Sequence, residues 1–187
     1  HEYELRSETL KWNGRIRQSP ARGFMGARIE LIAHQLAIAL EASGRLQPRL
    51  MLADEVGLGK TIEACLILHH LLLTKRASRA LILVPEPLTH QWFVELMRRF
   101  NMTFAIFDEE RCVSIESGDP DANPFLDSQW VLAATDFLAN DPIRAQQALE
   151  AEFDVLIVDE AHHLDWTPQE ASEAYRVVEA LAAKVPS

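Results

Sequence analysis

This sequence has few cysteines, no long apolar run and no excess of positive charge. Its two cysteines, Cys65 and Cys112, lie far apart and form no C-x-x-C pair. This spacing argues against a disulfide framework or a cysteine-based zinc site, and it favours a reduced, intracellular protein. The apolar stretch 66–73 contains two histidines and is too short to span a membrane. The polar N-terminus shows no signal peptide.

The charge is acidic overall and unevenly distributed. The formal net charge is −10, with 8 basic and 5 acidic residues in 1–50 but 10 basic and 23 acidic residues in 51–187. An acidic body binds DNA poorly by itself, because neutralisation of phosphates dominates such affinity. Four arginines in the basic N-terminal part either contact nucleic acid or an acidic partner, or form a solvated arm: Arg15, Arg17, Arg22 and Arg28.

The hydrophobic pattern predicts an α/β fold. Apolar runs predict strands over 50–53, 80–84, 103–107, 130–134 and 155–158. Helices are predicted over 28–42, 61–73 and 88–100, from Asp141–Pro142 onward, and from a capping box at Thr167–Glu170. Residues 1–26 form a partly irregular lead-in segment, and 108–129 an acidic surface excursion. Alternating strands and helices predict one domain with a mostly parallel sheet that has helices on both faces.

A phosphate-binding loop follows the first predicted strand. It comprises Asp54, Glu55, Val56, Gly57, Leu58, Gly59, Lys60 and Thr61. The glycines let the backbone approach phosphates, Lys60 supplies positive charge to the β/γ oxygens, and Thr61 offers a hydroxyl to Mg²⁺. The strict pattern begins with glycine where this chain has Asp54, so an ordinary strand–turn–helix is the alternative interpretation.

A second acidic element follows the run Val155–Val158, which is typical of a buried parallel strand. Asp159 and Glu160 come at its carboxyl end, where open α/β sheets bind ligands. Asp159 is predicted to hold Mg²⁺, usually through water, and Glu160 to orient and deprotonate the attacking water. The alternative is a solvated acidic turn, which the loop at Lys60–Thr61 makes the weaker interpretation.

These motifs resemble the Swi/Snf branch of helicase-like ATPases. An Asp-Glu pair before Gly-x-Gly-Lys-Thr is usual in that branch, and the DEAH-type sequence Asp159–His162 is also similar. Three further segments resemble its motifs: Ile32–Gln35, Leu83–Trp92 and Ala133–Phe137. Arg98–Asn101, Phe107–Arg111 and Asn123–Phe125 resemble the members associated with bacterial RNA polymerase. The resemblance covers residues 28–187 well and residues 1–27 more loosely. It implies that residues 27–187 form an N-terminal RecA-like ATP-binding lobe of a P-loop NTPase.

The resemblance also implies roles for residues and partners. Gln35 would read the adenine of ATP, and His162 would couple the site to a second lobe. ATP and Mg²⁺ are the implied cofactors, DNA or RNA the track, and core RNA polymerase the partner of the full-length protein. The implied location is the bacterial cytoplasm, near the nucleoid, without membrane contact.

Two features leave the function open. The family's next strand motif and its second lobe with an arginine finger do not follow Glu160 in this sequence, so we expect a fragment that is weak or inactive in ATP hydrolysis. The alternatives are a DNA-translocating remodelling, repair or restriction motor of the same branch, and a non-catalytic module that binds polymerase or DNA.

Overall fold

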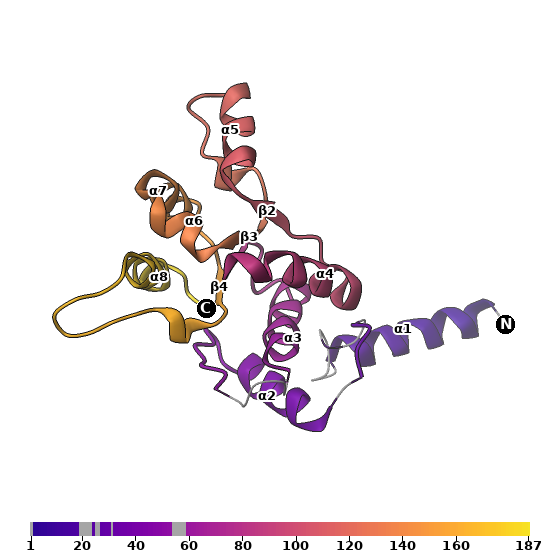
Figure 1. Ribbon diagram of the computed structural model, residues 1–187. Coiled ribbons are helices and arrows are strands. Elements are labelled where there is room, and N and C mark those ends of the chain that lie inside the picture. Colours follow the sequence, from indigo (N-terminus) through magenta and orange to yellow (C-terminus); the bar gives the residue numbers. More distant parts are fainter. Residues whose placement is uncertain (1, 19–23, 25–26, 31, 54–58) are drawn as a thin grey trace.

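A four-stranded parallel sheet forms the centre of the protein (Figure 1). The computed structural model describes residues 2–18, 24, 27–30, 32–53 and 59–187. Its strands are β1 (Ala80–Val84), β2 (Ala105–Phe107), β3 (Trp130–Ala134) and β4 (Val155–Val158), in the order β2-β3-β1-β4. Leu83 in β1 lies beside Ala133 of β3 and Val158 of β4. The strands therefore end at one common edge.

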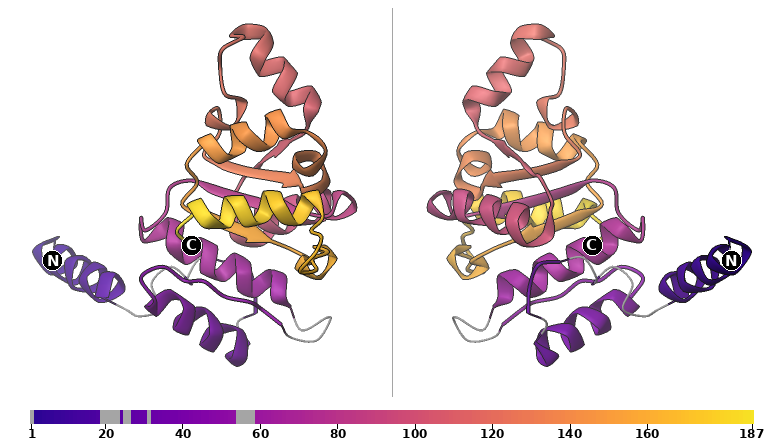
Figure 2. Two further views of the ribbon diagram at one scale, coloured as in Figure 1. Left: turned by 90° about the vertical axis from the view of Figure 1, so that its left-hand side faces the viewer. Right: turned by 90° about the vertical axis from the view of Figure 1, so that its right-hand side faces the viewer.

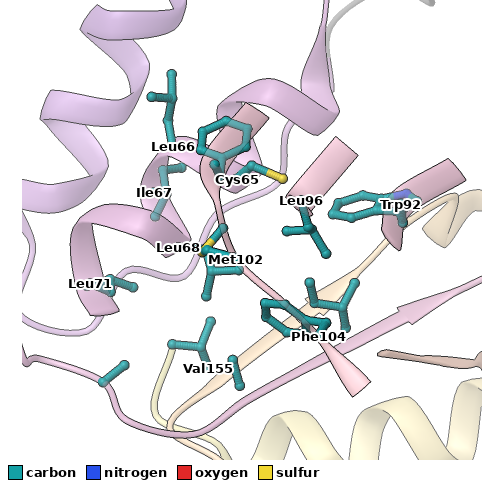
Figure 3. Close-up of a cluster of buried hydrophobic side chains, with 14 of the residues drawn as sticks. Cys65, Leu66, Ile67, Leu68, Leu71, Trp92, Leu96, Met102, Phe104 and Val155 are labelled. Atoms are coloured by element: carbon teal, nitrogen blue, oxygen red, sulfur yellow. The ribbon is translucent and has the colours of Figure 1, made fainter. Parts of the chain in front are cut away.

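One face of the sheet is covered by α3 (Lys60–Leu73) and α4 (Thr89–Phe100), with α2 (Ala33–Gly44) packed against α3. Ile82 and Val84 of β1 point to this face. The side chains that contact Ile82 and Val84 come mainly from α3, α4 and the segment before β2. Figure 3 shows this cluster and labels ten of its residues: Cys65, Leu66, Ile67, Leu68, Leu71, Trp92, Leu96, Met102, Phe104 and Val155. Burial of this apolar cluster fixes both helices on the sheet.

The opposite face is covered by α6 (Thr135–Asn140), α7 (Pro142–Glu150) and α8 (Glu173–Lys184). Leu81 and Leu83 alternate with the residues above and pack here against Leu138, Ala148 and Leu181. All five side chains of β1 are fully buried because successive residues enter the two different cores. The predicted α/β class with helices on both faces is confirmed.

Two helices extend from this body in both views of Figure 2. These are α1 (Glu2–Gln18) at the N-terminus and α5 (Glu109–Gly118) after β2. Three short 3₁₀ turns complete the described elements: η1 (Glu86–Leu88), η2 (Pro124–Leu126) and η3 (Ala161–His163). In the part of the chain that the structure describes, no helix is both long and apolar enough to cross a bilayer.

The start of β4 is anchored by Asp154. Its Oδ2 accepts hydrogen bonds from the backbone nitrogens of Ser78 at 2.7 Å and Arg79 at 2.9 Å, and from the Ser78 hydroxyl at 2.9 Å. Burial alone raises the pKa of this carboxyl, but these hydrogen bonds outweigh it and lower the pKa below its ordinary value. The clamp fixes β4 against the segment that enters β1.

The strands predicted over 80–84, 130–134 and 155–158 are confirmed, whereas the strand predicted over 50–53 is wrong. Leu50 and Met51 are 42% and 86% exposed. On the side of β4 away from β1, the Leu156 nitrogen instead donates to the Ser187 carbonyl at 2.8 Å. Residues 50–53 therefore bury little and form no ladder with the described strands.

Three helix predictions also differ from the structure. The lead-in contains α1, and the helix predicted from Arg28 begins at Ala33. The capping box at Thr167 opens no helix, because Glu170 bonds back to Thr167 within a closed turn, and Trp166 bridges Ala171. Helix α8 begins at Glu173, where the Ser172 hydroxyl caps the Tyr175 nitrogen.

Candidate nucleotide and metal site

The turn after β4 places Asp159 at the carboxyl edge of the sheet. The Asp159 nitrogen donates to the Leu83 carbonyl at 2.9 Å, which extends the pairing of β4 with β1 by one residue. Asp159 is thus fixed by the sheet itself and not by a free loop. This is the edge at which parallel α/β sheets bind ligands.

Both oxygens of the Asp159 carboxylate accept hydrogen bonds. The Trp92 indole nitrogen donates to Oδ2 at 2.7 Å, and the Glu160 backbone nitrogen donates to Oδ1 at 2.9 Å. Trp92 lies on α4 and is only 3% exposed. The two donors fix the direction in which the carboxylate points. Each oxygen keeps a second lone pair for a metal ion or its water shell.

The sequence does not reveal the contact between Trp92 and Asp159, and Trp92 was named only within the motif-like segment Leu83–Trp92. The residue does pack in the apolar cluster, but its N–H also has to be satisfied once it is buried. The available signal was one tryptophan in that segment together with the carboxylate pair Asp159–Glu160. It could not say which carboxylate accepts the bond, because that depends on how α4 crosses the end of β4.

Glu160 turns the chain sharply away from the strand. Its backbone is left-handed, with φ 50° and ψ 40°, which is uncommon for a residue with a side chain. The side chain is 40% exposed, and its Oε2 lies 3.1 Å from His162 Nδ1. Glu160 therefore presents a carboxylate to solvent directly beside the fixed Asp159. That arrangement suits a group that receives a proton from water.

Helix α3 supplies the other half of the candidate site. Gly59 is its N-cap, with φ 90°, and Lys60 and Thr61 are its first residues. The Gly59 carbonyl accepts from the nitrogens of Ile62 and Glu63 at 2.8 and 3.1 Å. The N-terminus of this helix favours anions. The other predicted loop residues lie outside the described residues: Asp54, Glu55, Val56, Gly57 and Leu58.

Gln35 lies against the beginning of α3. It is 4% exposed, and its Nε2 occupies the space into which a Cβ at Gly59 would project. Glycine is thus required at position 59 by both the positive φ and the approach of Gln35. Gln35 therefore does not face solvent. Its role in reading adenine stays a prediction.

Cys65 on α3 is fully buried, and burial raises the pKa of its thiol, with smaller contributions from the charges of Glu95 and Asp159. In both views of Figure 2, the beginning of α3 and the turn after β4 lie toward the same side of the molecule.

The donors available here fit Mg²⁺ and a nucleotide. Thr61 offers a hydroxyl and Asp159 a carboxylate, the hard oxygen ligands that Mg²⁺ prefers. Lys60 and the helix N-terminus supply the complementary positive end for phosphates. The carboxylates of Asp159 and Glu160 add negative charge that a divalent cation would offset.

Comparison with known proteins agrees with this architecture. A family model described as "Type III restriction enzyme, res subunit" matches residues 27–185. The chain belongs to this family. It is also 55% identical to the RNA polymerase-associated protein RapA of Vibrio cholerae over 98% of its length, and 51% identical to RapA of Histophilus somni over 99%. It spans only 19% of the length of each of these relatives.

A solved structure confirms the fold class. The chain resembles the Sulfolobus solfataricus SWI2/SNF2 ATPase core in complex with dsDNA, with a TM-score of 0.65 and 20% identity over 82% of this chain and 30% of that one. Likeness at this identity shows the RecA-like fold alone. Together with the family match and the RapA relatives, it makes the chain a helicase-like ATPase domain.

Proposed function

We propose that this chain is the ATP-binding lobe of a Swi/Snf-type translocase that acts on nucleic acid together with RNA polymerase. The observation that carries the proposal is Asp159, held by Trp92 and by its bond to β1 at the carboxyl edge of the sheet, where parallel α/β sheets bind ligands. The residues of the phosphate loop, Asp54 to Thr61, would enclose the phosphates.

Each side chain has a distinct task in this proposal. Bound ATP supplies the phosphoryl group, and Mg²⁺ neutralises its charge. Lys60 places positive charge at the phosphates, while Thr61 and Asp159 hold the metal, Asp159 usually through water. Glu160 orients a water molecule and takes its proton as it attacks. His162, exposed beside Glu160, would pass the state of the site to a second lobe.

The proposed partners come from the relatives. The RapA proteins are named for association with RNA polymerase, and the solved SWI2/SNF2 core was bound to dsDNA. We extend both to this chain: core RNA polymerase as the partner of the whole protein, and DNA or RNA as its track in the bacterial cytoplasm. The 55% identity over 98% of the chain favours this assignment over a restriction or repair motor.

Titration with a fluorescent ATP analogue and Mg²⁺ tests the site. We expect saturable binding by the wild type and a loss of about 10-fold or more in Lys60→Ala, because removing a charged hydrogen-bonding partner costs about 1.5–3 kcal/mol. Lys11→Ala is the matched control, since Lys11 carries the same charge on the exposed helix α1.

Equal binding by wild type and Lys60→Ala would show that the site is misassigned. An assay in which this chain captures core RNA polymerase, with and without nucleotide, then distinguishes a motor from a non-catalytic binding module. Capture that depends on nucleotide supports the motor, whereas tight capture with no nucleotide dependence supports the module, for which the basic N-terminal part argues. Arg49, at the end of this basic part, already has structural partners, since it donates to the carbonyls of Ala182 and Val185.

A further inference from the structure

Three metal-ligating side chains gather on the turn after β4. Among the residues that the structure describes, Glu160, His162 and His163 offer ligand atoms that all lie within 4.8 Å of one another. The rings of His162 and His163 have centroids 4.1 Å apart. His163 has no role in the proposed ATPase site, and its place in this cluster is unexplained by packing because it is exposed.

The backbone brings the three side chains together. Glu160 adopts a left-handed conformation, and one turn of 3₁₀ helix follows, in which the His163 nitrogen donates to the Glu160 carbonyl at 2.9 Å. The chain therefore folds back on itself within four residues. Strain of this kind at a non-glycine residue is typical of functional sites.

We propose that Glu160, His162 and His163 form a binding site for a transition-metal ion of the Zn²⁺ class. Two imidazoles and one carboxylate, with water in an open position, are a recurring zinc ligand set. Ligands at about 2.0–2.1 Å from a tetrahedral ion lie about 3.3 Å apart. Glu160 Oε2 and His162 Nδ1 are already 3.1 Å apart. Small rotations about the side-chain bonds of His163 would bring one of its ring nitrogens to the same ion as the other two ligands.

This site differs in chemistry from the predicted Mg²⁺ site. Imidazole nitrogens favour Zn²⁺, Co²⁺ or Ni²⁺ over Mg²⁺. Asp159 is not a member of the cluster, and its oxygens accept from Trp92 and from the Glu160 nitrogen. A metal bound to Glu160 would compete with proton uptake by that carboxylate and so inhibit hydrolysis. This consequence rests on the proposed function, whereas binding itself does not.

Titration of the nucleotide-free chain with Co²⁺, followed by its visible absorption, tests the site directly. We expect one equivalent of Co²⁺ to bind and to be displaced by Zn²⁺. His163→Ala should weaken binding by about 100-fold or more, since even partners outside the ligand shell are worth 10- to 100-fold. Glu160→Gln should weaken it as well.

His90→Ala provides the matched control, because it removes an exposed histidine of α4. It should bind Co²⁺ as the wild type does. Wild-type affinity in His163→Ala, or no saturable binding by a wild-type chain with a normal circular dichroism spectrum, would overturn the proposal. Neither result bears on ATP binding, which Lys60→Ala tests separately.

Discussion

The Trp92 indole is the side chain through which α4 orients the Asp159 carboxylate. In Trp92→Phe the apolar ring remains but the donor to Oδ2 is lost. A hydrogen bond to a charged group contributes about 1.5–3 kcal/mol, so we expect a loss of that size in the free energy of unfolding. We also expect about 10-fold weaker Mg²⁺-dependent binding of the ATP analogue, measured by Mg²⁺ titration.

Trp130→Phe makes the same change at a residue far from Asp159. The Trp130 indole donates to the Ser78 carbonyl at 3.2 Å, a neutral acceptor. This variant should lose about 0.5–1.5 kcal/mol of stability and keep its Mg²⁺ dependence. If both variants lower nucleotide binding equally, Trp92 acts through general stability and not through the direction of the Asp159 carboxylate.

Short sequence patterns reveal which chemical groups a site contains more readily than they reveal how those groups are arranged in space. Lys60–Thr61 and Asp159–Glu160 could be named from the sequence because each pattern is local. The contacts of Trp92 with Asp159 and of Gln35 with Gly59 could not, since they join residues that only the packing of helices brings together. The chemical roles of all these residues stay predictions.

At the scale of elements, Arg144 holds α5 against α7. It is 5% exposed and donates to both oxygens of Glu109, at 2.7 and 2.9 Å, and to Glu116. Gln147 also donates to Glu116, at 3.0 Å. Chiefly because of the hydrogen bond from Arg144, the pKa of Glu116 falls from 4.5 to about 2.

A carboxyl whose pKa is lowered in the folded state stabilises the protein above its unfolded pKa. The contribution of Glu116 is thus present above pH 4.5 and is lost as the pH falls toward about 2. We expect Glu116→Gln to destabilise the chain at neutral pH and to flatten the fall in stability over this window. Urea unfolding at several pH values measures both effects.

Glu110→Gln is the control, because Glu110 is exposed on the same helix. It should keep the acid dependence of the wild type. An unchanged dependence in Glu116→Gln would mean that other carboxylates carry the acid sensitivity.

Prediction of elements succeeded where burial alone determines the structure. The runs 80–84 and 155–158 are continuously apolar and form strands between two helical layers, as predicted. Prediction failed where one local sequence pattern is compatible with two different structures. Leu50–Ala53 has the composition of a strand but finds no described partner, and Thr167 makes the hydrogen bond of a capping box within a turn. Only the surrounding structure distinguishes these outcomes.

At the scale of the whole molecule, burial divides the chain into a firm body and an exposed arm. The five residues of β1 are fully buried and pair with strands on both sides. The large apolar side chains of α1 remain 59–84% exposed: Tyr3, Leu5, Leu10 and Trp12. An isolated helix of this length is marginal in water, because its stability normally comes from a packed face. The α/β class was predictable from the alternating pattern, and residues 1–26 were set apart as a partly irregular lead-in. That this lead-in contains a helix with exposed apolar side chains was not predictable, because the sequence does not show which helix lacks a packing partner.

Native-state hydrogen exchange tests that division. Amides of β1 and β3 should exchange only through global unfolding, and those of α1 through local opening that costs little free energy. Helix α3 is the internal control, since it has 14 residues against 17 in α1 but buries most of one face. If helix length alone gave protection, α1 would exchange no faster than α3. Protection of α1 equal to that of α3 would therefore contradict this division. If that protection also depended on protein concentration, α1 would pack against a second copy of the chain in solution; if it did not, helix length alone would account for it.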